Sequence, residues 1–165
     1  DNYIPKYQLN NHNDEFSQSI LDLKNRNLYS ISFWTKVFSK FIPENKKFVV
    51  CCVPPSNPHA KFSGIREVAF NIRVKKKLIM GEHLLFRREK VASQKSRIKS
   101  IEEIKTSINF FSEGKQLVLN KHILLFDDII TTSNSIHACS EILLENGAKK
   151  VSTIVLGSTM KIISF

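Results

Sequence analysis

One run of thirteen residues, from Ile123 to Ser135, constrains the fold of this chain more than any other segment: ILLFDDIITTSNS. Its first four residues are apolar, as in a β-strand that is covered on both faces of a sheet. Two carboxylates follow, then two apolar and five small polar residues, and then a helical pattern that ends near Gly147. The apolar face of that helix carries Ile136, Cys139, Ile142 and Leu143. The order of strand, acids, polar turn and helix predicts an α/β fold with a ligand site beyond the end of the strand.

The polar turn between this strand and helix favours an anionic ligand. Free backbone N–H groups and the positive end of the dipole attract phosphate to a helix N-terminus. The carboxylates of Asp127 and Asp128 instead suit sugar hydroxyls or a hard cation. A ribose 5-phosphate satisfies both ends of the run. The alternative is purely structural, because Ser, Thr and Asn are ordinary N-cap residues and acidic pairs follow strands in other α/β proteins.

The run resembles the motif that binds 5-phosphoribosyl-1-diphosphate (PRPP) in type I phosphoribosyltransferases: a strand, two acids, two apolar residues, Thr-Thr-Gly, any residue, and Thr or Ser. The resemblance implies that Asp127 and Asp128 bind the ribose and, indirectly through PRPP, Mg²⁺. It implies that the 5-phosphate is bound by Ile130, Thr131, Thr132, Ser133, Asn134 and Ser135. The helix and strand in HACSEILLENGAKKVSTIVLG continue the resemblance, which is closest to the ComF-type competence branch, without that branch's zinc ribbon.

Ser133 departs from this motif, because the family has glycine there. If the position requires a positive φ, serine costs about 1 kcal/mol or more in strain. If the backbone is ordinary, serine adds a hydroxyl donor at no cost. The first case is compatible with weak or absent PRPP binding.

A second apolar strand, predicted over residues 48–53, ends at Pro54-Pro55, which cannot continue a central ladder. The residues after it form a turn rich in Pro, Ser and Asn. In type I phosphoribosyltransferases the corresponding loop holds the diphosphate of PRPP, often through backbone N–H groups. The candidates here are Pro55, Ser56, Asn57 and Lys61. The alternative is a strand that simply ends in a proline-rich turn.

The positive charge is concentrated between residues 59 and 105. This stretch has thirteen Lys or Arg and five Glu, so it contributes +8 of the net +10. It is either a solvated face, a phosphate-neutralising segment, or a surface for single-stranded nucleic acid. Within it, REKVASQKSRIKS stands where the superfamily has a mobile loop over PRPP. The resemblance therefore implies that Lys95 and Arg97 assist catalysis together with Asp128.

The chain of 165 residues, with 42% hydrophobic and 24% charged residues, has the length and composition of one globular domain. We expect an N-terminal helical part over 1–45 and a PRPP-binding core over 46–165. Two apolar stripes are expected in the first part: Phe16, Ile20 and Leu23, then Phe33, Val37, Phe38 and Phe41. The core should hold a mostly parallel sheet with flanking helices. No run reaches the roughly 20 apolar residues of a membrane span.

Three cysteines, Cys51, Cys52 and Cys139, lie in apolar patterns without metal-ligand spacing, which predicts buried thiols in a cytoplasmic protein. Two functions remain open. One is an enzyme that transfers phosphoribosyl from PRPP, with Mg²⁺, to a nucleobase and releases pyrophosphate. The other is a non-catalytic ComF-like protein that binds PRPP, single-stranded DNA or both. Both functions are compatible with a homodimer, and the oligomeric state is left open. A receiver-type phosphotransfer domain is disfavoured because the acids lie late in the chain and lead straight into a hydroxyl-rich turn.

Overall fold

The computed structural model describes residues 2–3, 15–44, 47–57, 63–88, 100–130 and 133–159, with side chains described over 15–157 of these ranges. The helices are α1 (Glu15–Lys24), α2 (Leu28–Ser39), α3 (Gly64–Lys76), α4 (Ile101–Thr106), the 3-10 turn η2 (Ser112–Gly114), α5 (Lys115–Val118) and α6 (Asn134–Glu145). The strands are β1 (Asn2–Tyr3), β2 (Phe48–Cys52), β3 (Ile79–Met80), β4 (Leu85–Phe86), β5 (Asn109–Phe110), β6 (His122–Ile130) and β7 (Lys150–Thr159).

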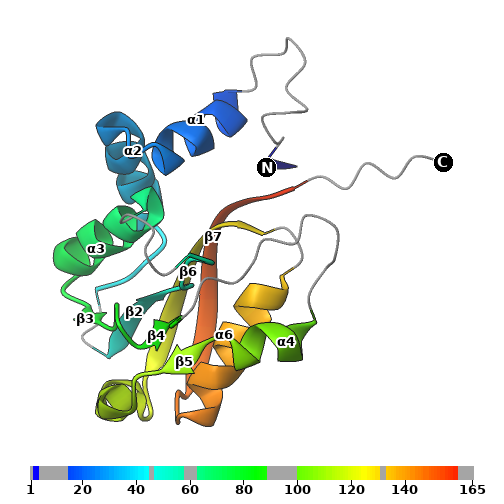
Figure 1. Ribbon diagram of the computed structural model, residues 1–165. Helices are drawn as coiled ribbons and strands as arrows, with labels where there is room; N and C mark the ends of the chain where they lie inside the picture. The colour runs from blue at the N-terminus through cyan, green and yellow to red at the C-terminus, as the bar shows by residue number, and fades with distance from the viewer. Residues whose placement is uncertain are drawn as a thin grey trace.

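The central sheet has five strands in the order β1-β7-β6-β2-β3, and every pairing in it is parallel. The longest strands, β6 and β7, lie at its middle (Figure 1). A separate antiparallel pair joins β4 to β5. The predicted α/β architecture with a mostly parallel sheet is therefore confirmed.

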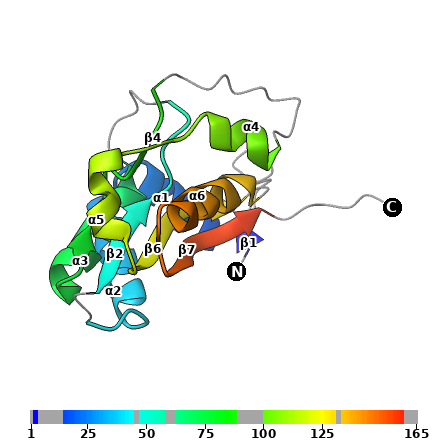
Figure 2. The same ribbon diagram turned by 90° about the horizontal axis from the view of Figure 1, so that it is seen from below.

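Helices cover both faces of this sheet, as Figures 1 and 2 show from two directions. The helices α1, α2 and α3 bury Ile20, Trp34 and Val68 in one core with Val50 and Phe126 of the sheet. The helix α6, together with α4 and α5, encloses a second core on the opposite face, where Leu125 packs with Leu143. Burial on both faces explains why β2 and residues 123–126 of β6 are apolar without interruption.

The N-terminal helices agree only in part with the predicted stripes. Ile20 and Leu23 of α1 are buried as expected. The second stripe is wrong at both ends, because Phe33 and Phe41 are exposed, while Ile31 and Trp34 form the buried face of α2. The helix begins at Leu28, five residues before the first aromatic residue of that stripe. Asn27 caps this start, because its side chain accepts hydrogen bonds from two backbone N–H groups.

Two features of the long run around the acidic pair are clear in the structure. The helix α6 buries the predicted apolar face, and Gly147, with φ +98°, follows its end. The strand before it is longer than expected: β6 continues to Ile130 through its pairing with β7, so Asp127 and Asp128 lie within the strand. All three cysteines are buried. Within the described ranges, no helix has both the length and the apolar character that crossing a bilayer requires.

Candidate active site

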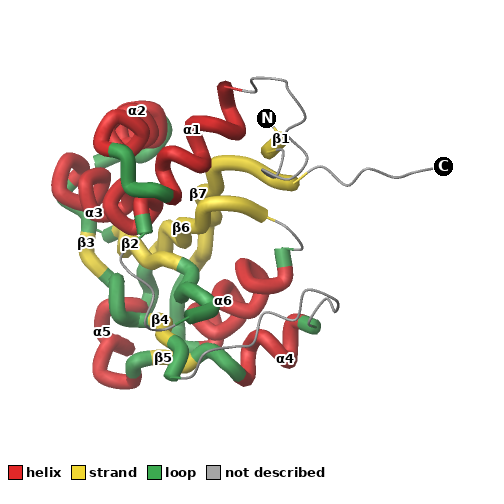
Figure 3. The backbone as a smooth tube through the Cα atoms, turned by 45° about the horizontal axis from the view of Figure 1, so that its top comes forward, coloured by secondary structure: helices red, strands yellow, loops and turns green. Residues whose placement is uncertain are grey.

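Two strand ends meet at the carboxyl edge of the sheet. The strands β2 and β6 pair in register from Phe48 opposite His122 to Cys52 opposite Phe126. The Val53 N–H then donates a hydrogen bond of 2.9 Å to the Phe126 carbonyl, after which the proline-rich turn leaves the sheet. Because β6 continues beyond this point, the turn and the acidic pair become neighbours. Figure 3 shows β6 extending past β2 toward the N-terminus of α6.

The acidic pair is held by its own backbone. The Asp128 N–H donates to Asp127 Oδ1 at 2.9 Å, and the Ile129 N–H donates to Asp128 Oδ1 at 2.8 Å. The second oxygen of Asp128 lies 3.6 Å from Lys24 Nζ, which comes from the end of α1. These contacts orient both carboxyl groups, and they bring the N-terminal helical part to the edge of the site.

Burial, and to a lesser extent the nearby Asp128 carboxylate, raises the pKa of Asp127 to about 7. The hydrogen bond from the Asp128 N–H and the charge of Lys24 act in the opposite direction, but they do not compensate. The pair therefore has an excess of negative charge near neutral pH. It is suited to a ligand that brings hydrogen-bond donors or a cation.

The same carboxylates fit a hard cation by chemistry, since Mg²⁺ prefers oxygen ligands. Within the part of the chain that the structure describes, no group of three or more His, Cys, Asp or Glu side chains could hold a metal. Two carboxylates with no third protein ligand fit an ion whose other ligands are water and a bound phosphate. This donor set agrees with indirect metal binding and not with a metal site built by the protein alone.

A cavity of about 320 Å³ adjoins the acidic pair, a volume in the range of small-molecule sites. It is lined by Val53, Pro54, Pro55, Ser56, Ser63, Ile65, Arg66, Arg87, Asp127, Asp128 and Ser135. The structure thus brings both sequence segments into one site. Of the predicted residues, Pro55, Ser56, Asp127, Asp128 and Ser135 line the cavity.

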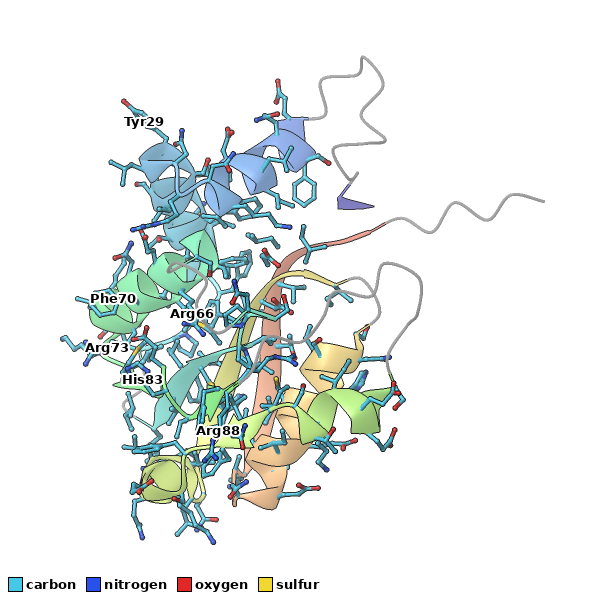
Figure 4. The ribbon with its side chains drawn as sticks, in the orientation of Figure 1. Tyr29, Arg66, Phe70, Arg73, His83 and Arg88 are labelled. Carbon is cyan, nitrogen blue, oxygen red and sulfur yellow. The ribbon has the colours of Figure 1, made fainter. Side chains whose placement is uncertain are left out.

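Two arginines in this lining were missed by the sequence analysis. Arg66 lies in the first turn of α3, and it points toward the sheet in Figure 4. Arg87 follows β4 and is only 8% exposed. A signal for Arg87 was present, since it directly follows the apolar run Leu84–Phe86, where a solvated arginine is unusual. Both are more than 35 residues away from the acidic pair in sequence, so local spacing could not connect them.

The helix α6 begins at the edge of the cavity. Ser133, which precedes it, has φ +61° and ψ −12°, a left-handed conformation. The backbone therefore requires the positive φ for which the related motif has glycine, and serine bears the strain. Its carbonyl accepts the first hydrogen bond of the helix, from the His137 N–H at 2.9 Å.

Several predicted site residues are not among those that line the cavity. Asn57, Ile130, Ser133 and Asn134 are described but do not belong to the lining. Lys61, Lys95, Arg97, Thr131 and Thr132 lie outside the described residues. The roles suggested for these nine residues remain predictions.

Comparison with known proteins places the fold. No protein-family model matches the chain, and no curated protein is similar to it in sequence. A structure of the allosteric regulatory enzyme of purine biosynthesis matches with a TM-score of 0.51 and 13% identity, over 76% of this chain and 25% of that one. The hypoxanthine phosphoribosyl transferase of Trypanosoma cruzi matches with a TM-score of 0.50 and 10% identity, over 88% of this chain and 70% of that one.

This chain thus spans about a quarter of the purine-biosynthesis enzyme and most of the Trypanosoma enzyme. At such low identities the likeness is one of fold. The chain has a phosphoribosyltransferase-type α/β fold, and its function has to be argued from its own residues.

Proposed function

We propose that this protein binds PRPP and transfers its phosphoribosyl group to a nucleobase. The observation that carries the proposal is the single cavity in which the acidic pair of β6, the proline-rich turn after β2 and Ser135 of α6 meet. A phosphate, a ribose and a diphosphate need three different environments. This cavity offers the start of a helix for the first, carboxylates for the second, and cationic side chains for the third.

In this proposal Asp127 and Asp128 accept hydrogen bonds from the two ribose hydroxyls, which offsets the excess negative charge of the pair. The 5-phosphate lies at the N-terminus of α6, near Ser135. Mg²⁺, when bound with PRPP, would neutralise diphosphate charge, with Asp127 and Asp128 as its nearest carboxylates.

The reaction is a displacement at C1 of the ribose. A ring nitrogen of the base forms the new C–N bond while the C1–O bond breaks, the diphosphate leaves with the electron pair, and the proton of that nitrogen is released to water. The ribose carries positive charge at C1 in the transition state, as in glycosyl transfer. The chain's residues contribute by orienting PRPP and by neutralising the leaving group. Lys95 and Arg97 are proposed to assist there, and Asp128 to stabilise the charged ribose.

The base would enter beneath the N-terminal helical part, residues 1–45, packed on a core of residues 46–165. This placement is supported by the ion pair between Lys24 of α1 and Asp128. Lys24 occupies a position from which ribose hydroxyls or a cation must displace it. The identity of the base is left to experiment.

Calorimetric titration of PRPP with Mg²⁺ tests the proposal directly. We expect micromolar binding by the wild type and a loss of at least about 100-fold in the variant with Asp127→Asn and Asp128→Asn, since two charged hydrogen-bond acceptors are removed. The matched control is Asp22→Asn, on α1, which leaves the cavity intact. Equal binding by the double variant, or no binding by a folded wild type, would contradict the proposal. Pyrophosphate release with a panel of bases then tests transfer.

A second candidate function, binding of single-stranded nucleic acid as in the ComF-like alternative, is favoured by one surface. Aromatic rings are exposed on both α2 and α3, and one of them lies beside a cationic side chain. Tyr29, Phe33 and Phe70 are 88%, 55% and 44% exposed. Arg73 lies 6.0 Å from the centre of the Phe70 ring, and Figure 4 shows both on the outside of α3. Exposed rings beside cations are the usual platform for unpaired bases.

A groove of about 580 Å³ between α2 and α3, which Lys36 and Lys75 help to line, continues this face. Anisotropy of a labelled single-stranded oligonucleotide would measure its binding. We expect Tyr29→Ala with Phe33→Ala to weaken binding about tenfold, because each stacked base contributes roughly 1–3 kcal/mol. Leu144→Ala, an exposed position on α6, is the control. Unchanged oligonucleotide binding by the variant with Tyr29→Ala and Phe33→Ala would contradict this function.

A further inference from the structure

Arg87 has an unusual environment for an arginine. Its side chain is almost fully buried, at 8% exposure, yet it lines the cavity. One guanidinium nitrogen donates a hydrogen bond to Ser107 Oγ, at the end of α4. Its Nε has no hydrogen-bond partner, and within the described ranges Arg87 forms no ion pair. Among the described residues, the hydrogen-bond partner of this charged group is therefore one neutral hydroxyl.

A buried guanidinium without an ion pair is energetically unfavourable unless an anion binds to it. A guanidinium keeps its proton inside proteins, so burial cannot be relieved by neutralisation. Burial does lower the pKa of Arg87, in line with an environment that disfavours its charge. Buried charges in folded proteins are normally paired, and a cavity next to the group leaves room for the partner.

The two prolines of the turn after β2 reduce the number of backbone N–H groups that the turn can offer to a diphosphate. Pro54 and Pro55 have no N–H group, so two of the backbone donors expected there are absent. Ser56 and Ser63 contribute hydroxyls to the lining, and among the described residues its cationic side chains are Arg66 and Arg87. The charge required by a phosphate ligand therefore comes from α3 and from the end of β4.

We propose that the Arg87 guanidinium, with Arg66, is the receptor for a diphosphate group in this cavity. The identity of the ligand as the diphosphate of PRPP rests on the proposed function, whereas the anion site itself rests on the buried, unpaired arginine. The fork of N–H groups can hold two oxygens of one phosphate at once. Since Arg87 also bonds Ser107, ligand binding would fix the end of α4 relative to the sheet.

Inorganic pyrophosphate is the probe, measured by calorimetry and by the shift in melting temperature. We expect pyrophosphate to raise the melting temperature of the wild type. In Arg87→Met the affinity should fall at least about tenfold and the shift should vanish. Without ligand this variant should melt no lower than the wild type, because an unpaired buried charge has been removed. Arg88→Met, at the exposed neighbouring position, should behave as the wild type.

Two further measurements make the result decisive. Arg66→Gln should weaken pyrophosphate binding while leaving Arg87 in place, and it replaces Arg87→Met as the readout if that variant fails to fold. Binding of pyrophosphate within twofold of the wild type in both variants overturns the inference, even where PRPP binds and the proposed function holds. Arginine-dependent pyrophosphate binding by a protein that does not bind PRPP supports the anion site and rejects the proposed function.

Discussion

The two strand-to-helix turns that form the cavity are built in opposite ways. Before α6, Ser133 adopts a left-handed conformation that favours glycine, and near the end of β6 the pKa of Asp127 is raised to about 7, mainly by burial. At the start of α3, the helix that follows β2, the chain is closely packed instead. Gly64, the first residue of α3, lies so close to α1 that an added Cβ would be 2.0 Å from the Leu23 carbonyl oxygen.

This comparison distinguishes residues whose conformation or charge suits a ligand, such as Ser133 and Asp127, from a residue that serves close packing, Gly64. Strained backbone and unbalanced charge persist in folded proteins where the surrounding structure holds them, and they concentrate at functional sites. The end of β6 and the residue before α6 have these two features, so substitutions there can stabilise the protein at the expense of binding. Among the described residues between β2 and α3, 53–57 and 63, none has a positive φ, and at Gly64 any larger residue should destabilise the protein.

The largest expected effect is at Gly64. Gly64→Ala should lower the free energy of unfolding by about 3 kcal/mol, because the contact is with backbone atoms of α1 and cannot be relieved by a side-chain rotation. Urea denaturation followed by circular dichroism measures the change. The neighbouring substitution Ser63→Ala should change the stability by less than about 0.5 kcal/mol, since the Ser63 side chain makes no capping hydrogen bond.

The next effect concerns Asp127 and depends on pH. Its pKa in the folded protein, about 7, lies above the ordinary 3.8. Between these pH values the folded protein keeps a proton that the unfolded chain has released, so stability falls as the pH rises through this window. Asp127→Asn lacks this loss, and at pH 8 it should be more stable than the wild type by about 1–2 kcal/mol, allowing for partial exposure.

Thermal melts of the wild type and Asp127→Asn between pH 4 and pH 8 provide the check. The curves should coincide near pH 4 and diverge as the pH approaches 7, with a difference of about 2–4 °C per kcal/mol. Asp22→Asn should show no such divergence. A constant difference across the whole range would mean that Asp127 titrates as in the unfolded chain.

The smallest effect is at Ser133. Ser133→Gly should stabilise the protein by about 0.5–1 kcal/mol, because glycine adopts a φ of +61° without strain. Ser135→Gly offers the opposite case within the same segment, since position 135 is helical and glycine there should be destabilising. Chemical denaturation of the two variants should therefore give changes of opposite sign. If both substitutions changed the stability in the same direction, backbone strain at Ser133 would be contradicted.

The segment from β6 to α6 was largely predictable from the sequence, because its parts are consecutive in the chain. Its strand, acids and helix are consecutive, so hydrophobic pattern and residue type were enough to identify them. The end of the strand was not, because β6 extends by pairing with β7, which lies later in the chain. Arg66, Arg87 and Lys24 reach the site through tertiary packing. The hydrophobic pattern of the sequence does not indicate which distant segments pack together.

The prediction for α2 was wrong at Phe33 and Phe41 for a related reason. Aromatic residues were assigned to the core because they are apolar, whereas the buried face of this helix is set by Ile31 and Trp34. Large apolar side chains on the outside of a helix are not distinguished from core residues by hydrophobicity alone. Of these two exposed rings, Phe33 also belongs to the surface for which nucleic-acid binding is proposed above.

Strand alternation gives the molecule two internal thiol reporters. Cys51 and Cys52 are adjacent in β2, but Cys51 belongs to the core beneath α6 and Cys52 to the core beneath α3. Burial raises the pKa of both thiols, that of Cys51 to about 12, so neither reacts with an alkylating reagent while its layer is closed. Peptide mapping of the alkylated protein would therefore time the opening of each helical layer separately, from two neighbouring residues of one strand.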